Sequence, residues 1–502
     1  MKRRRMEFLF LLVLMAALYV IFLTGYSFWI KLSFALIYTF IILITAYSLM
    51  LENRSAQATL LWIYVLVFIP VLGYLFYLYS GQLYLKGYLF YHKRRNDRDE
   101  WERVMKSESS PDLSFLQDNQ LEFAKFADRV AFSSLNSKSR TTILKNGDET
   151  FSKIKEELAK AEEYIHMEYY IFRSDRLGKE IMDILIEKAK AGVEVLFTFD
   201  SAGSIHLSNE DIKAMQAAGI QVYPFSPLKY GFFNQKFNFR NHRKIIVIDG
   251  KVGFVGGLNV GIEYLGEDPD FGFWRDTHMM LEGEAVHTLH TVFLLDWQYV
   301  SGDNLLGDYE PPVTEAEDEW NGAVQVVASG PDTAEGVMSD LYYTMMSSAK
   351  QSIWIATPYF VPNESIRTAL RIAASKGIQV RIMVPEINDG FLTQYATRSY
   401  FAELLRCGAE IYSYQKGFMH QKIIIVDGNL ASLGTANMDM RSFHLNFEVN
   451  VFMLGSTSIR DLVAHYEADM KDSVRIMPVE YYKRGIWHRT KESFARMFSG
   501  VL

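Results

Sequence analysis

The feature that most constrains the fold is a polar pattern that occurs twice in the chain at matched spacing. The first copy begins at His242 and reads His-x-Lys, four apolar residues, Asp, six further residues and then Gly-Gly-x-Asn. The second copy begins at His420, about 178 residues later, and ends in Gly-Thr-x-Asn. Chance does not supply five matching residue types at identical spacing, so the sequence predicts a duplicated unit.

The segments around each copy also repeat as strands and helices. Apolar strand-like runs alternate with segments of helical periodicity, and a glycine ends each helix, which predicts an α/β fold made of two related domains. We expect the two domains to pack as a pseudo-twofold pair. The predicted order is strand 164–172, helix 179–191 and strand 193–199 in the first half, and strand 352–361, helix 365–376 and strand 378–384 in the second.

The composition along the chain predicts four regions. A segment rich in Pro and acidic residues at 301–322 is interpreted as the connection between the halves. The predicted regions are a membrane anchor at 1–91, a charged linker at 92–111, a first domain at 112–322 and a second domain at 323–502 that ends in an amphipathic tail from Tyr481.

The N-terminal region contains three long apolar runs. About 20 apolar residues suffice to cross a bilayer, so we predict spans near 8–28, 31–51 and 59–79 and a multi-pass protein of the cell membrane. The length of the first run favours retention over cleavage as a signal peptide. Basic residues precede the first run and follow the third, and both groups are expected on the inner side of the membrane. Three spans cannot place both ends on that side, so the orientation and the choice between two and three spans stay open.

Composition excludes several kinds of site. The formal net charge of -7 disfavours binding of nucleic acid by bulk electrostatics. The single cysteine, Cys407, allows no internal disulfide and no cysteine-ligated metal site. We find no cluster of histidines and carboxylates at metal-ligand spacing, so neither a metal nor another cofactor is expected. His287 and His290 lie in an amphipathic helical segment and are expected at its surface.

The residue types in the repeated pattern suit chemistry on a phosphodiester. Lysine and asparagine side chains can bind its oxygens without a metal. One neutral histidine can attack phosphorus, and the other can act as acid and then as base. Asp276 and Glu448 follow the two copies at comparable places, and we propose them as orienters of His242 and His420. For Asp249 and Asp427, a turn role and a catalytic contribution remain alternatives.

The paired pattern resembles the phospholipase D superfamily, and the stretches FRNHRKIIVIDG and GFVGGLNVGIEYLG resemble bacterial cardiolipin synthases. The resemblance covers nearly the whole chain. It implies two phospholipase D-type domains sharing one site, in which two phosphatidylglycerol molecules give cardiolipin and glycerol. It implies His242 as nucleophile and His420 as acid and base. The implied catalytic residues are His242, Lys244, Asp249, His420, Lys422 and Asp427, with phosphate contacts from Asn259 and Asn437.

The chain departs from the family at Gly256-Gly257, where many relatives carry Gly-Ser. The first half therefore lacks a hydroxyl donor at this position, and phosphate binding is expected to depend more on the second half, where Thr435 supplies one. Other readings remain: a lipid hydrolase, a transferase to another alcohol, a nucleic-acid phosphodiesterase, or an inactive lipid-binding scaffold. The aromatic loop 230–240 and the C-terminal tail could each contact a membrane or pack on the core. The oligomeric state is left open.

Overall fold

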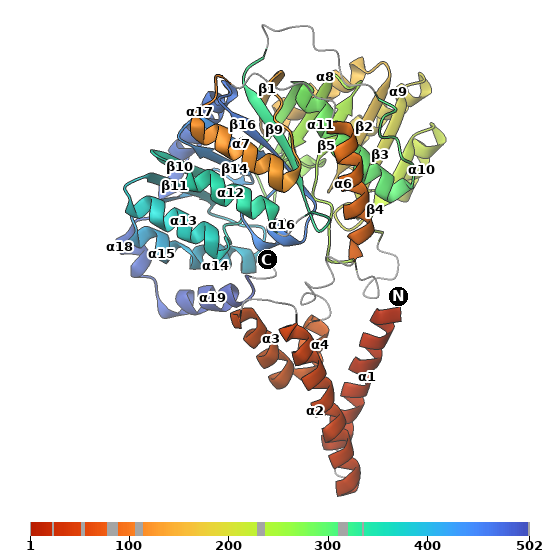
Figure 1. Ribbon diagram of the computed structural model, residues 1–502, viewed down its shortest axis with the longest axis vertical. Helices are drawn as coiled ribbons and strands as arrows, with labels where there is room; N and C mark the ends of the chain where they lie inside the picture. The colour runs from red at the N-terminus through yellow and green to blue at the C-terminus, as the bar shows by residue number, and fades with distance from the viewer. Residues whose placement is uncertain are drawn as a thin grey trace. The chain divides into compact units, whose positions relative to one another are not determined.

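The computed structural model describes residues 2–22, 25–51, 56–77, 89–105, 114–227, 236–309, 320–333 and 336–499. The chain forms two compact units (Figure 1). One comprises Met1–His92 and Leu228–Phe239, and the other comprises Lys93–Pro227 and Arg240–Leu502. The second unit contains the repeated pattern.

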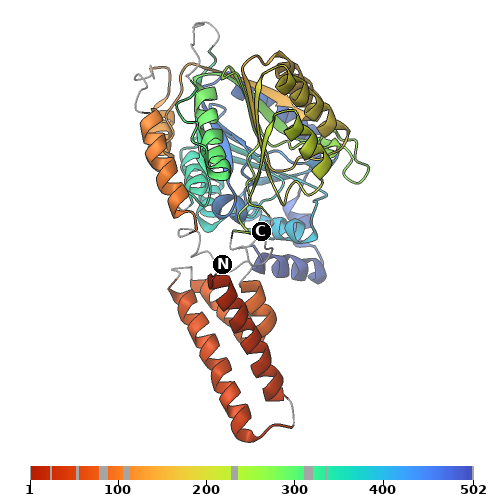
Figure 2. The same cartoon turned by 90° about the vertical axis from the view of Figure 1, so that its right-hand side faces the viewer.

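The first unit is helical. Its helices α1 and α2 contact each other, α3 contacts α2 and α4 (Figure 2), and Leu14, Leu49 and Leu66 are fully buried in a small apolar cluster. Many of the other apolar side chains of these helices are exposed. Helices that are apolar on all sides are expected in an apolar environment such as a membrane. The helices are α1 (Lys2–Phe22), α2 (Phe28–Met50), α3 (Ala56–Phe68) and α4 (Pro70–Phe76).

Among the described residues, only α2 is long and apolar enough to cross a membrane, and it matches the predicted span 31–51. The other two predicted spans contain shorter apolar helices, Leu11–Phe22 and Thr59–Phe68, so the prediction of a multi-pass protein is not supported. The span near 59–79 is interrupted at Ile69, where φ is -130° and ψ is 60°. The ring of Pro70 disfavours the helical conformation at the residue before it, which ends α3 there.

The predicted duplication is confirmed by the two large sheets of the second unit. The strand order is β1-β8-β6-β5-β2-β3-β4 in one sheet and β17-β12-β11-β10-β14-β15-β16-β9 in the other. All seven strands of the first sheet correspond in order and direction to seven strands of the other. In each sheet three strands run parallel, and the strands that follow the histidine pattern pair antiparallel beside them.

The elements of the first half agree with the predicted order. They are α6 (Tyr91–Met105), α7 (Asp118–Ala131), β1 (Ser139–Lys145), α8 (Asn146–Lys160), β2 (Tyr164–Tyr169), α9 (Arg176–Lys190), β3 (Glu194–Asp200), α10 (Asn209–Ala217), β4 (Gln221–Phe225), β5 (Ile245–Ile248), β6 (Val252–Gly256), the 3-10 helix η3 (Ile262–Leu265), β7 (Trp274–Arg275), β8 (Thr277–Gly283) and α11 (Glu284–Ser301).

The second half repeats this plan and adds helices at its end. Its elements are β9 (Ala323–Ser329), α12 (Val337–Ser347), β10 (Ser352–Ala356), α13 (Glu364–Ser375), β11 (Gln379–Pro385), α14 (Phe391–Ser399), α15 (Phe401–Arg406), β12 (Glu410–Tyr414), β13 (Phe418–Met419), β14 (Ile423–Val426), β15 (Leu430–Gly434), α16 (Met440–His444), β16 (Glu448–Leu454), α17 (Ser458–Lys471), β17 (Ser473–Arg475), α18 (Pro478–Tyr482) and α19 (Ile486–Met497).

Local signals explain the helix ends that the sequence predicted. Asp175 caps α9 by accepting the Gly178 N–H at 3.0 Å, and Asn363 caps α13 in the same way. Gly192 follows α9 and Gly377 follows α13, with φ of 97° and 86°. Glycine adopts this left-handed backbone without steric cost, so both helices end where the sequence indicated.

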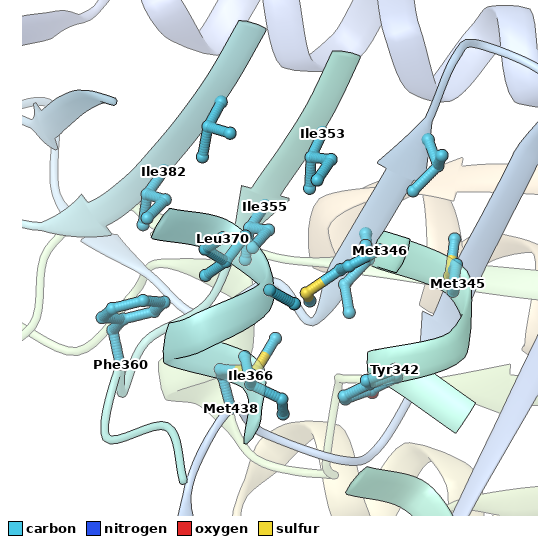
Figure 3. Close-up of a cluster of buried hydrophobic side chains, with 14 of the residues drawn as sticks. Tyr342, Met345, Met346, Ile353, Ile355, Phe360, Ile366, Leu370, Ile382 and Met438 are labelled. Carbon is cyan, nitrogen blue, oxygen red and sulfur yellow. The ribbon is translucent and has the colours of Figure 1, made fainter. Parts of the chain in front are cut away.

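Three apolar clusters hold the second unit together. One is shared by the facing sides of both sheets and includes α11 and α17. The other two cover the outer faces. Figure 3 shows the cluster of the second half, where Ile353 and Ile355 of β10 pack against α12 and α13. Alternate residues of β10 point to opposite faces, so Ala356 belongs to the shared cluster instead.

Helix α11 lies inside the unit and contacts strands of both halves. This position corrects the expectation that its histidines lie at the surface. His290 is buried, and its Nε2 lies 2.7 Å from Nδ1 of His166, while His287 is only partly buried. A helix covered by two sheets buries most of its circumference, which a pattern of apolar periodicity alone does not reveal.

Two predicted regions fall partly outside the described residues. The charged segment 92–111 is helical as far as Met105, as part of α6. Residues 106–113 lie outside the described residues, as do 310–319 of the predicted connection between the halves. The bounds of the four predicted regions stay predictions.

Candidate active site

Backbone hydrogen bonds tie each copy of the pattern to the opposite half. His242 donates its N–H to the carbonyl of Phe447 at 2.9 Å, and His420 donates its N–H to the carbonyl of Arg275 at 2.7 Å. The short strands β13 and β7 continue this contact as a parallel pair. Each histidine therefore lies against the segment that follows the other copy, and the two copies meet at the junction of the halves.

Each histidine is paired with a carboxylate from the other half. Nδ1 of His242 lies 2.9 Å from Oε2 of Glu448, and Nδ1 of His420 lies 2.8 Å from Oδ2 of Asp276. Asp276 and Glu448 were proposed from their places after the motifs as orienters of the histidines. The structure brings them to the histidines, and the pairing crosses between the halves.

The carboxylate contact determines which ring nitrogen carries hydrogen. An ionised carboxylate only accepts hydrogen bonds, so Nδ1 of each imidazole donates to it, and the ammonium of Lys422 then donates to Nε2 of His420 at 3.0 Å. In a neutral ring this leaves the lone pair on Nε2. Both imidazoles are therefore held in the tautomer in which Nε2 can act as a nucleophile or as a base.

Burial and neighbouring charge favour neutral imidazoles. Burial lowers the pKa of His242 to about 4, and Glu448 offsets only part of this effect. Burial and the ammonium of Lys422 lower the pKa of His420 to about 3, against the opposing effect of Asp276. Burial alone would raise the pKa of each carboxyl. Lys422 and His420 nevertheless lower that of Asp276, and His242 and Lys244 lower that of Glu448.

The two lysines lie just before strands β5 and β14, and both are buried. Nζ of Lys244 donates to the carbonyl of His242 at 2.7 Å, and Nζ of Lys422 donates to the carbonyl of His420 at 2.5 Å. Burial lowers the pKa of Lys244 to about 7 and that of Lys422 to about 8. The carboxylates Glu448 and Asp276 both oppose these shifts, so both ammonium groups share one electrostatic environment.

Asp249 and Asp427 lie away from the histidines, at the far ends of β5 and β14. The carboxylate of Asp249 accepts three backbone N–H groups of residues 162–164 at 2.8 Å each. That of Asp427 accepts those of residues 350–352 at 2.7 to 2.8 Å. Both residues have positive φ, near 50°. The contacts favour the turn role over a catalytic contribution for both aspartates.

The two asparagines differ in their surroundings. The side chain of Asn259 accepts the N–H of Ile171 at 3.1 Å and donates to the hydroxyl of Tyr264 at 3.0 Å. Asn437 is buried, and its Oδ1 has no hydrogen-bond partner among the described residues. Asn437 is therefore the better placed of the two to accept a new contact from a bound molecule.

Gly257 and Thr435 occupy equivalent positions with different consequences. A Cβ atom at Gly257 would lie only 2.1 Å from Oδ1 of Asp276, so glycine there lets the carboxylate approach. The hydroxyl of Thr435 instead donates to Oε2 of Glu448 at 2.6 Å. Thr435 thus binds the orienting carboxylate, whereas the sequence suggested it as a phosphate donor.

Several residues that support the histidines were missed by the sequence analysis. Arg243 forms a buried ion pair with Asp296 of α11 and donates to the carbonyl of Glu448 at 3.1 Å. In the other half Asp469 of α17 accepts from Arg275 and from Gln421, both at 2.8 Å. The available signal was Asp296, the one aspartate inside the mainly apolar helix α11, because a buried carboxylate requires a partner. Helix α17 also carries Asp461 and Glu467, so it offered no such signal for Asp469.

Aromatic rings line the same region. The ring of Tyr170 lies edge-on to His242 with centroids 4.9 Å apart, and Trp274 lies 5.1 Å from His420. The described residues contain no group of three or more histidines, cysteines or carboxylates that could hold a metal ion. Residues 230–235 of the predicted aromatic loop lie outside the described residues.

A family model described as "Cardiolipin synthase, PLD-like domain" matches residues 154–297 and 342–472, one match in each half. A second model, described as "Phospholipase_D-nuclease N-terminal", matches residues 34–82. Together the matches cover more than half of the chain and include all four histidine and lysine positions of the repeated pattern.

The chain is also similar to curated proteins along its whole length. It is 59% identical over 505 residues to the probable cardiolipin synthase YwiE of Bacillus subtilis, with 100% of each chain covered. It is 44% identical over 508 residues to the cardiolipin synthase of Halalkalibacterium halodurans, again with 100% of each covered. Among solved structures, phosphatidylserine synthase of Haemophilus influenzae shares the fold, with a TM-score of 0.58 at 13% identity over 77% of this chain and 100% of that one.

Proposed function

We propose a detailed reaction from the premise that the chain belongs to the cardiolipin synthase family of phospholipase D-like proteins and is a phosphatidyltransferase. The proposed reaction moves a phosphatidyl group from one phosphatidylglycerol to a second, giving cardiolipin and glycerol. The observation that carries it is the pair of buried imidazoles, each oriented through Nδ1 by a carboxylate of the other half. Two such groups supply one nucleophile and one proton carrier.

In the first step, Nε2 of His242 attacks the phosphorus of a bound phosphatidylglycerol. The new N–P bond forms as the P–O bond to the glycerol headgroup breaks, and protonated His420 donates its proton to the departing alkoxide. Glycerol leaves, and the phosphatidyl group remains on His242 as a phosphohistidine. Glu448 stabilises the positive charge that develops on the His242 ring.

In the second step, a headgroup hydroxyl of another phosphatidylglycerol attacks the same phosphorus. His420, now neutral, takes the hydroxyl proton, the O–P bond forms and the N–P bond breaks. Cardiolipin is released, and His420 is protonated again for the next cycle. The reaction is balanced without water and without a nucleotide-activated lipid.

The electrostatics of the site support this division of labour. With both histidines neutral, Lys244 and Lys422 balance Asp276 and Glu448. An anionic phosphodiester adds one negative charge, which favours protonation of one imidazole when substrate is bound. We assign phosphate contacts to the two lysines and to Asn437, and a weaker contribution to Asn259, whose amide already has two partners.

The test uses the purified full-length protein in mixed micelles with phosphatidylglycerol as the only phospholipid. Labelled headgroup glycerol and cardiolipin should appear in equal amounts. Acid-quenched samples of His420→Ala should retain less phosphohistidine than samples quenched in base, because an N–P bond is acid-labile. His242→Ala should form neither the adduct nor cardiolipin.

Three results would contradict the proposal. Phosphatidic acid in place of cardiolipin would show that water is the acceptor and the protein is a hydrolase. Full turnover by both histidine variants would place the chemistry elsewhere. An exchanged headgroup upon addition of another alcohol, with no cardiolipin from phosphatidylglycerol alone, would show a different acceptor.

A further inference from the structure

Helix α19 exposes an apolar face while it packs on α14 through the opposite face. Glu492 and Ala495 are buried, and they mark the inner face. The outer face carries four large apolar side chains. Their exposed fractions are 75% for Ile486, 77% for Trp487, 55% for Phe494 and 55% for Met497.

The positions of these four residues along the helix explain why they share one face. At 3.6 residues per turn, positions 486, 487, 494 and 497 fall within about 100° of one another. A surface helix of a globular protein usually turns its apolar stripe inward. The arrangement in α19 is reversed. Its apolar stripe faces away from α14, and Phe494 lies edge-on to Phe498 at the end of the same helix, with ring centroids 5.1 Å apart.

Basic residues flank the apolar stripe. Arg489 and Lys491 are exposed and lie on either side of it at helical spacing. The ammonium of Lys491 lies 5.8 Å from the centroid of Phe391 and 5.4 Å from that of Tyr395, both on α14. An apolar and aromatic stripe with cations along its edges is the arrangement of a helix that lies in a lipid–water interface.

The apolar surface continues onto the start of α14. Ile387 is 74% exposed and Phe391 is 63% exposed. Between them, Asp389 accepts a hydrogen bond from the hydroxyl of Tyr359, and its negative charge opposes the lowering of the pKa of Lys422. Helices α14, α15, α18 and α19 gather at one end of the second half (Figure 1). The exposed apolar surface therefore adjoins the candidate active site.

We propose that this surface, formed by the outer face of α19 together with Ile387 and Phe391, docks on the surface of an anionic lipid bilayer and holds the entrance of the active site at the lipid headgroups. Arg489 and Lys491 beside the stripe match anionic headgroups in charge, and lysine is depleted at protein–protein interfaces. The inference rests on the proposed function only in one respect, which is that the lipid on which the surface docks is also the substrate.

The first test measures lipid contact without turnover. Phe494→Cys is labelled with an environment-sensitive fluorophore in full-length protein whose Cys407 is replaced by Ser, and the protein is placed in nanodiscs. With phosphatidylglycerol present, emission should shift to the blue and nitroxide-labelled lipids should quench it. The matched control is Glu187→Cys on the exposed face of α9, which should show neither effect.

Three outcomes of the first test would overturn the proposal. The emission of the label at 494 could match that of the control. It could shift equally in nanodiscs of phosphatidylcholine alone, which would remove the anionic requirement. In detergent, the emission could shift to the blue to a degree that rises with protein concentration. That result would make the surface an interface between copies of this chain.

The second test measures the effect on turnover. Trp487→Ser combined with Phe494→Ser should raise KM for phosphatidylglycerol in mixed micelles by about tenfold and leave kcat within about twofold, because burial of two large apolar side chains in lipid is lost. Ile205→Ser combined with Ile372→Ser removes exposed apolar side chains elsewhere and should leave both constants unchanged.

An equal rise of KM in the two double variants, or a fall of kcat without a change of KM, would overturn the proposal. Failure of the proposed function is distinguishable, because it would appear as no cardiolipin from the wild-type chain. The fluorescence measurement would still report whether α19 contacts the bilayer.

Discussion

The two histidine–carboxylate pairs are similar in geometry but not in surroundings. Glu448 accepts hydrogen bonds from the hydroxyl of Thr435 at 2.6 Å and from that of Ser442 at 2.9 Å. Asp276 instead receives the backbone N–H of Thr277 at 2.8 Å and lies against Gly257. Unequal surroundings are what two identical side chains need if one is to act as nucleophile and the other as acid and base.

The contact between Glu448 and His242 predicts a large kinetic effect of removing one charge. Glu448→Gln keeps the shape of the side chain but cannot stabilise the positive ring that forms on His242. We expect kcat to fall by about 10²- to 10⁴-fold while the protein stays folded. Release of labelled glycerol and thermal unfolding in detergent measure the two quantities.

Glu187→Gln on the exposed face of α9 is the matched control and should leave both quantities unchanged. Wild-type turnover in Glu448→Gln would show that the carboxylate does not assist the histidine.

At the scale of elements, Asp249 and Asp427 join the strands after the two motifs to the starts of β2 and β10. Each carboxylate satisfies three backbone N–H groups. We expect Asp249→Ala to lower the free energy of unfolding by about 1–3 kcal/mol and to leave kcat per folded molecule within a few fold. Denaturant unfolding and active-site-normalised turnover distinguish the effects. A loss of kcat as large as that of His242→Ala would restore the catalytic reading of this aspartate.

A buried lysine of helix α6 forms ion pairs with the core. Nζ of Lys93 lies 3.0 Å from Asp296, 2.9 Å from Asp332 and 2.5 Å from Asp97. Lys93→Met would leave buried carboxylates without their cation, so we expect the free energy of unfolding to fall by about 3–5 kcal/mol. Asp296 also pairs with Arg243 beside His242, so turnover should fall as well.

The same helix offers a matched comparison for the Lys93 variant. Arg95 lies 3.9 Å from Asp99, and both side chains are exposed, at 72% and 65%. Arg95→Met should change stability by less than about 0.5 kcal/mol. Thermal unfolding of the two variants under one condition tests the difference, and equal effects would show that burial of the Lys93 cluster contributes nothing.

At the scale of the whole molecule, the junction of the halves concentrates buried titratable groups, which makes stability depend on pH. The pKa values of His242 and His420 are lowered to about 4 and about 3 from an ordinary value of 6.5. Between pH 6.5 and 4 the unfolded chain therefore binds protons that the folded chain does not. Stability should fall as pH falls through this window, by about 2–5 kcal/mol.

The paired carboxylates act in the same direction at lower pH. Their pKa values are lowered on folding, so the stability they contribute is present above their unfolded values and is lost as pH falls through the folded ones. The measurement is the thermal midpoint at pH 7, 5.5 and 4.5. Replacing His242 and His420 by Asn should reduce the slope in part, since buried His278 contributes in the same sense. An unchanged slope would contradict the assignment.

The sequence predicted the features that depend on local spacing. The alternation of strands and helices, the glycines that end α9 and α13, and the duplication of the two sheets follow from periodicity and from repetition of the pattern. The sequence also identified the residues that meet at the junction, because the same residue types recur at the same spacing. It did not identify Lys93, Arg243 or Asp469, because their partners are distant in the chain.

The amino-acid sequence by itself determined that two equivalent α/β units each present a histidine and a lysine ahead of a buried strand. Only the tertiary structure decided that each histidine contacts a carboxylate of the other unit and that the carboxylates of Asp249 and Asp427 accept backbone N–H groups. The physical reason is that strand and helix formation depend on neighbours along the chain. The pairing of a buried imidazole with a carboxylate depends instead on how two folded surfaces dock, and no local pattern encodes that docking.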